Sequence, residues 1–78
     1  MNYRERISRD PAVCGGEPVI RGTRVTLRTV LASLSDGDSP EVIVSAFPSL
    51  TLDDVRAVIA FAADSARDDL PLRDVSGF

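Results

Sequence analysis

The most informative segment of this chain reads Gly16-Glu17-Pro18-Val19-Ile20-Arg21-Gly22-Thr23-Arg24-Val25. It contains two short β-prone pieces, one ending at Ile20 and one around Val25, separated by a glycine. Gly22 can adopt positive φ at little cost, which favours a tight reversal of the chain at this point. The segment therefore predicts a small β-hairpin, or two strand fragments that pair across a dimer.

The residues before this segment predict an extended arm. Tyr3 to Asp10 has a short apolar centre at Ile7 and ends at Pro11, which disfavours helix at the preceding residue. Residues 1–26 are thus interpreted as a strand arm and turn.

Three amphipathic helical patterns follow within residues 27–67. The first stops near Gly37, which suits the left-handed position after a last turn. The second begins at Ser39 as cap and closes at Pro48, and the third begins at Thr51, with Asp54 placed for a near-capping box. The apolar positions expected to face the core are Leu27, Val30, Leu31 and Leu34 in the first helix, Val42, Ile43, Ala46 and Phe47 in the second, and Val55, Val58, Ile59, Ala62 and Ala66 in the third.

The patterns together predict a mainly α fold, a three-helix helix-turn-helix bundle of the homeodomain-like kind preceded by a short N-terminal β-hairpin or strand arm. Residues 1–67 form one domain, because 78 residues leave room for no more. Residues 68–78 form a C-terminal tail, which is either a frayed terminus or a segment that docks on a partner.

Composition argues against an enzyme. The chain has no histidine and a single cysteine, Cys14, so neither a metal site nor a cofactor is expected. It contains no apolar run long enough for a signal peptide or a membrane span, and we expect a cytoplasmic protein. A core this small, with only four aromatic side chains, favours a homodimer that shares apolar surface.

Charge is unevenly distributed along the chain. Residues 1–28 carry six arginines and three acids, whereas residues 29–78 carry three arginines and nine acids. If DNA is bound, the best candidates for the contacts are Arg21, Arg24 and Arg28, with Arg56 on the third helix. That helix opens with Asp53 and Asp54, which would face phosphates, and is a poor groove reader on charge grounds.

The sequence also resembles a bacterial family known as domain of unknown function 433. The resemblance covers about residues 6–67 and rests on Ile7-Ser8, Asp10-Pro11, Cys14 to Val25, Leu31, Asp36-Gly37, Phe47-Pro48 and Leu50-Thr51. It singles out the signature turn, which we define as Gly16, Pro18, Ile20, Gly22, Thr23 and Arg24, together with Pro48. Glu17 departs from the pattern, because a lysine is common there. The resemblance implies a homeodomain-like fold and the role of antitoxin to a PIN-like ribonuclease.

The leading functional hypothesis is thus an antitoxin of a type II toxin–antitoxin system that dimerises through its N-terminal strands, neutralises a PIN-like ribonuclease toxin and represses its own promoter. The candidate toxin-binding residues lie on the tail and are Leu70, Leu72, Arg73, Val75 and Phe78. The alternatives are a DNA-binding repressor without a toxin partner and a structural module that only dimerises.

Overall fold

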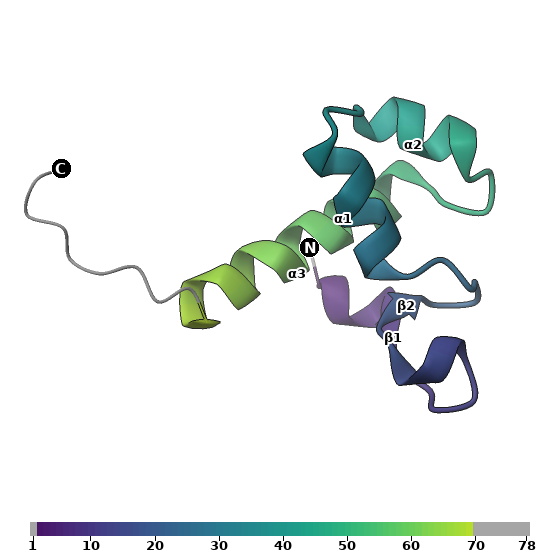
Figure 1. The fold of residues 1–78 in the computed structure, drawn as a ribbon, viewed down its shortest axis with the longest axis vertical. Helices are drawn as coiled ribbons and strands as arrows, with labels where there is room; N and C mark the ends of the chain where they lie inside the picture. Colours follow the sequence, from purple (N-terminus) through teal and green to yellow (C-terminus); the bar gives the residue numbers. More distant parts are fainter. Residues whose placement is uncertain (1, 70–78) are drawn as a thin grey trace, which may run out of the picture.

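A computed structural model describes residues 2–69, with side chains up to Arg67. The fold is mainly α, as predicted: a two-stranded antiparallel sheet precedes three helices (Figure 1). The elements in chain order are the 3-10 turn η1 (Tyr3–Glu5), β1 (Ile7–Ser8), the 3-10 turn η2 (Cys14–Gly16), β2 (Val19–Ile20), α1 (Leu27–Ser35), α2 (Pro40–Ala46) and α3 (Leu52–Asp69).

The helix ends follow from local sequence. The Ser39 hydroxyl accepts a hydrogen bond from the Val42 amide at 3.2 Å and caps α2. Thr51 and Asp54 form a reciprocal capping box at the start of α3, with the Thr51 amide donating to Asp54 Oδ2 at 2.9 Å and the Asp54 amide donating to Thr51 Oγ1 at 3.1 Å. Gly37 has a φ of 97°, which ends α1 as predicted.

The core lies where the three helices meet β2. It is formed by the buried residues Ile20, Leu27, Val30, Ile43, Leu50, Val55 and Val58. Four predicted core positions were wrong: Val42 is 51% exposed, Ile59 is 43% exposed, and Ala46 and Ala66 are exposed as well. Val42 and Ile59 each stand directly beside a buried residue, and neighbours in a helix point about 100° apart, so one of the two faces solvent. Ala46 and Ala66 lie in the last turns of α2 and α3. Ala57, which the pattern missed, is fully buried instead.

The N-terminal segment differs from the predicted extended arm. Tyr3–Glu5 is a 3-10 turn, because the Asn2 side chain accepts a hydrogen bond from the Arg4 amide at 3.2 Å. The strand in this segment comprises Ile7 and Ser8, which pair with β2 within the same chain, Ile7 opposite Ile20 and Ser8 opposite Val19.

The predicted hairpin is correspondingly reduced. The second β-prone piece contributes one isolated bridge, between Val19 and Thr26, and the Ile20 amide donates to the Val25 carbonyl at 3.0 Å. A longer strand cannot form there because Thr26 already caps α1, accepting the Thr29 amide at 3.1 Å. β2 therefore lies between β1 on one side and this short bridge on the other.

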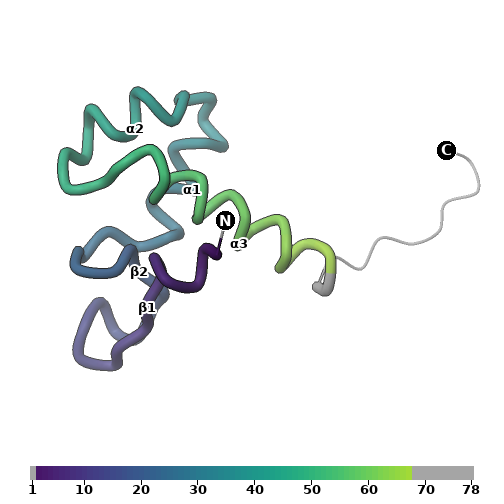
Figure 2. Tube along the Cα trace, turned by 180° about the vertical axis from the view of Figure 1, so that it is seen from behind, coloured from purple at the N-terminus to yellow at the C-terminus, as the bar shows by residue number. Residues whose placement is uncertain are grey.

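The N-terminal segment is fastened along α3 (Figure 2). Arg6 reaches the first turn of α3, with 3.1 Å between its Nη1 and Asp54 Oδ1 and 3.6 Å between its Nη2 and Asp53 Oδ2. Further along the helix, the Tyr3 hydroxyl donates to Asp64 Oδ2 at 2.7 Å, and the Tyr3 ring meets Phe61 edge to face. These contacts fix the position of the strands, and of the segment they carry, against the helices.

Candidate functional site

The signature turn is held by its own hydrogen bonds. The Thr23 amide and hydroxyl both donate to the Ile20 carbonyl, at 3.0 and 2.8 Å, and the Val25 amide donates to Thr23 Oγ1 at 3.0 Å. Gly22 has a φ of 80° and Arg21 a negative φ, which is the pattern of a type II turn. An added Cβ at Gly22 would meet no atom within 4 Å, so the requirement for glycine is one of backbone conformation.

A second segment with unusual backbone angles, residues 14–16, contacts this turn. Cys14, Gly15 and Gly16 have successive positive φ values of 50°, 65° and 86°. The left-handed region is uncommon for cysteine, and here the residue places its thiol to donate to the Arg24 carbonyl at 3.4 Å. Cys14 therefore ties η2 to the signature turn.

Most of the signature turn serves this architecture. Ile20 is buried in the core, the Pro18 carbonyl accepts the Leu27 amide at 3.0 Å, and Gly22 and Thr23 shape the reversal. Arg24 is different, since its side chain is exposed and forms no ion pair with any residue in the range 2–67. It is the signature residue whose side chain is left available for a partner.

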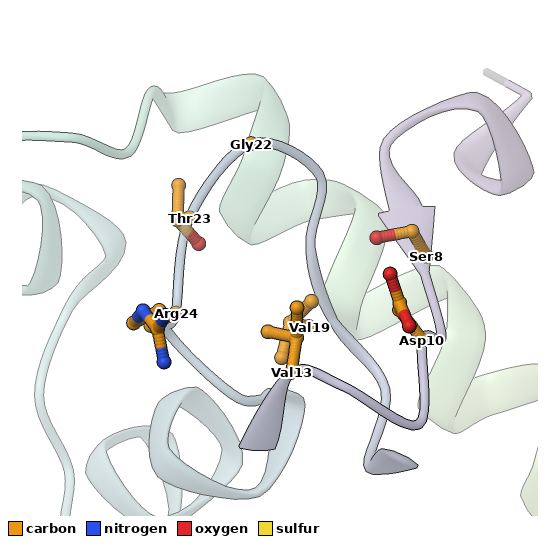
Figure 3. Close-up of a pocket in the computed structure, with 7 residues that line it drawn as sticks. All are labelled: Ser8, Asp10, Val13, Val19, Gly22, Thr23 and Arg24. Atoms are coloured by element: carbon orange, nitrogen blue, oxygen red, sulfur yellow. The ribbon is translucent and has the colours of Figure 1, made fainter. Parts of the chain in front are cut away.

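Arg24 lies on the wall of an open pocket of about 380 Å³ (Figure 3). The pocket is lined by Ser8, Asp10, Val13, Val19, Gly22, Thr23 and Arg24. Asp10 and Ser8 stand on one side and Arg24 on the other, with the two valines between them. Asp10 Oδ1 accepts the Ala12 amide at 2.9 Å, which fixes that carboxylate at the rim. The pocket thus offers the Asp10 carboxylate, the Arg24 guanidinium and an apolar floor to a segment of a partner protein.

The four arginines predicted to contact DNA fall into two groups. Arg28 is paired with Glu17, with 3.0 Å between its Nη2 and Oε1, and Arg56 is paired with Asp53 at 3.2 Å. Arg21 and Arg24 are exposed, and neither has an acidic partner within the part of the chain described. The positive charge open to a partner is therefore concentrated at the signature turn.

The sequence did not predict that Ser8 and Asp10 lie opposite Arg24 in the pocket. Asp10 belongs to the motif that carries the family resemblance, but nothing in the sequence places it opposite Arg24. The pairing of β1 with β2 does so, since it brings Ser8 next to Val19. The predicted toxin-binding residues Leu70, Leu72, Arg73, Val75 and Phe78 lie outside the described residues.

Two structural findings delimit the chemistry of residues 2–69. No group of three or more histidine, cysteine, aspartate or glutamate side chains is placed there to hold a metal ion. No helix in that range is both long and apolar enough to cross a bilayer.

Comparisons with known proteins place the chain among uncharacterised bacterial relatives. It is 41% identical over 59 residues to an uncharacterised protein, y4eO, of Sinorhizobium fredii; the match covers 76% of this chain but 27% of that protein, so the chain spans about a quarter of its relative's length. The crystal structure of a DUF433 member protein from Anabaena variabilis has a TM-score of 0.73 and 28% identity, covering 85% of this chain and 69% of that one. The family described as "Protein of unknown function (DUF433)" matches residues 7–62, well over half of the sequence, and the chain belongs to this family.

Proposed function

We propose that this protein is the antitoxin of a bacterial toxin–antitoxin pair and that it binds a PIN-like ribonuclease through the surface around the signature turn. The observation that carries the proposal is Arg24, an exposed guanidinium without an acidic partner in the described chain, on a turn whose other residues are fixed in place. The fixed turn limits the backbone entropy lost on binding, and the planar guanidinium of Arg24 matches carboxylates.

The chemistry of the partner fits this arginine. PIN-like ribonucleases use clustered carboxylates that hold a divalent metal, and such a cluster is a strong site for bidentate arginine pairing. An arginine inserted there would occupy the carboxylates in place of the metal ion. The valines on the pocket floor would bury apolar atoms of the partner beside this ion pair.

The first turn of α3 favours a protein partner over DNA. Asp53 and Asp54 stand at the helix end that would approach the phosphates of a duplex in a helix-turn-helix reader, and Arg6 and Arg56 are already engaged with them. Inserting this end into a groove would place carboxylates against phosphates. A surface built around Arg24 avoids that repulsion.

The test is co-expression with the product of the adjacent gene, followed by affinity purification and calorimetric titration. Arg24→Gln removes a charge-assisted hydrogen bond worth about 1.5–3 kcal/mol, so the dissociation constant rises roughly tenfold to a hundredfold. Arg4→Gln is the matched control: it removes the same charge from η1, where Arg4 lies over the Tyr3 ring, 5.5 Å from its centroid. If the adjacent gene product is not a ribonuclease, or does not copurify, the proposal fails.

The tail supplies a separate prediction from sequence. Truncation after residue 69 removes Leu70, Leu72, Arg73, Val75 and Phe78 and should weaken toxin binding if these residues anchor the toxin. Unchanged affinity after truncation, combined with a loss on Arg24→Gln, would assign the interface to the signature turn alone.

A second candidate function is repression of the chain's own promoter. The supporting observation is that Arg21 and Arg24 lie on one turn without an acidic partner among the described residues, with Arg28 nearby in sequence. Two or three phosphate contacts predict a slope of about −2 to −3 in the logarithm of the binding constant against the logarithm of salt concentration. A mobility-shift assay at low salt with promoter DNA, with and without the toxin, checks this function, and the absence of a shifted band in both would refute it.

A further inference from the structure

The outer face of α3, which we define as Leu52, Arg56, Ile59, Ala63 and Ala66, has no covering element within the described chain. Ile59 is 43% exposed, and Arg56, Ala63 and Ala66 are exposed as well. Val55 and Val58, on the adjoining side of the helix, are buried in the core. The C-terminal half of α3 extends beyond α1 and α2 (Figures 1 and 2).

The spacing of this face is that of a coiled-coil seam. Its members follow one another at alternating intervals of four and three residues, the repeat that keeps a stripe facing a partner helix. The two alanines leave room for close approach of a second helix, and Ile59 is large enough to cover one of them. With 18 residues, α3 is about 27 Å long, which accommodates all five positions.

Charge on one flank indicates which helix fits. Asp53 and Arg67 lie one heptad before and one heptad after Ala60, and so occupy the same edge of the seam. A second α3 packed antiparallel about Ala60 brings Asp53 of each copy against Arg67 of the other. A parallel pair cannot match them, because equivalent edges then lie on opposite sides of the seam.

Both partners in this match are accessible. The Asp53 side chain already pairs with Arg56 at 3.2 Å and with Arg6 at 3.6 Å, but it is 50% exposed and its two oxygens can share a further guanidinium. Arg67 is exposed and forms no ion pair with any other described residue. The antiparallel arrangement also keeps the two bundles at opposite ends. The C-terminal half of each α3 then lies along the N-terminal half of the other copy's α3, beside that copy's helical bundle.

We propose that the outer face of α3 is the interface for a second copy of this chain, packed antiparallel about Ala60. In this dimer Ile59 packs on the second copy's Ala63, and the apolar stem of Arg56 lies over the second copy's Ala66. The surface is separate from the signature turn, so each copy presents its own Arg24. It also differs from the N-terminal strands, where the sequence led us to expect self-association.

The first test is the oligomeric state by sedimentation equilibrium. Ala63→Glu leaves the monomer intact, because the residue is exposed, but places a carboxylate against Ile59 in the dimer; we expect the dissociation constant to rise at least about tenfold. Ala32→Glu, the same change at an exposed alanine of α1, is the control and should leave dimerisation unchanged. A wild-type chain that is monomeric, or a dimer that tolerates Ala63→Glu, overturns the proposal.

The second test is the orientation of the pair. In a Cys14→Ser background, A60C should form an interchain disulfide under mild oxidation, since the two copies of residue 60 meet at the centre of an antiparallel dimer. R67C, one heptad away on the same edge, should not, because it faces residue 53 of the other copy. Crosslinking of R67C but not A60C would contradict the antiparallel arrangement.

Discussion

Replacement of Asp54 by alanine should destabilise this domain more than any other single change of a charged residue described here. The Asp54 carboxylate accepts the Thr51 amide at 2.9 Å and the Arg6 guanidinium at 3.1 Å, and the residue is only 8% exposed. It therefore closes the N-terminus of α3 and fastens the N-terminal segment to that helix at the same time.

The magnitude follows from these two interactions. Loss of a helix cap costs about 1 kcal/mol. The pair with Arg6 contributes about 1 kcal/mol, a value at the low end for charged hydrogen bonds because the Arg6 side chain is 39% exposed and partly screened. A loss of about 2 kcal/mol corresponds to a fall in Tm of roughly 8–16 °C for a domain of this size.

Thermal unfolding followed by circular dichroism at 222 nm measures this effect. Arg28→Ala is the control, since it breaks a surface pair with Glu17, away from α3, and should cost about 0.5 kcal/mol or less. The double-mutant cycle with Arg6→Ala isolates the pair and should give a coupling of about 1 kcal/mol. Additive effects of Arg6→Ala and Asp54→Ala, or a Tm change no larger than that of Arg28→Ala, would refute the assignment.

Two further substitutions test the signature turn and the core. Gly22→Ala should cost about 1–2 kcal/mol although space is available for the methyl group, because the φ of 80° is strained for any L side chain; unfolding in urea that matches the wild type would show that the turn relaxes. Val42→Thr should change stability by less than about 0.5 kcal/mol, whereas Ile43→Ala on the same helix should cost about 2–5 kcal/mol, and equal effects would return Val42 to the core.

The helices could be predicted from sequence because their signals are local. The capping residues Ser39 and Thr51 accept hydrogen bonds from amides three positions later, so the residues that begin each helix lie close together in the sequence. Whether a helical side chain faces the core or the solvent was less predictable, as Val42 and Ile59 show. Each stands beside another apolar residue, and only the packing of the neighbouring helix decides which of the two is covered.

The pocket could not be predicted because it depends on pairing between distant segments. Gly22 predicts a turn, but the strand that pairs with β2 is formed by Ile7 and Ser8 rather than by the residues after the turn. Likewise, no local pattern indicates that the Arg6 side chain reaches Asp54, 48 positions away. The backbone of Arg6 accepts the Arg21 amide at 2.8 Å, so one residue contacts both α3 and the signature turn.

The arginines explain how an acidic chain presents a positive surface at one place. The net charge is −3, yet Arg6, Arg28 and Arg56 are each held by an acid, and Arg4 lies over an aromatic ring. Within residues 2–67, the arginines without such a partner are Arg9, Arg21, Arg24 and Arg67. Three of these fall between residues 9 and 24, in and beside the signature turn. Long-range attraction to a polyanion such as DNA is weak for a chain of net negative charge, whereas a short-range pair with a recessed carboxylate depends on the local arginine alone. The distribution of partnered and unpartnered arginines therefore favours recognition of a compact acidic site on a protein.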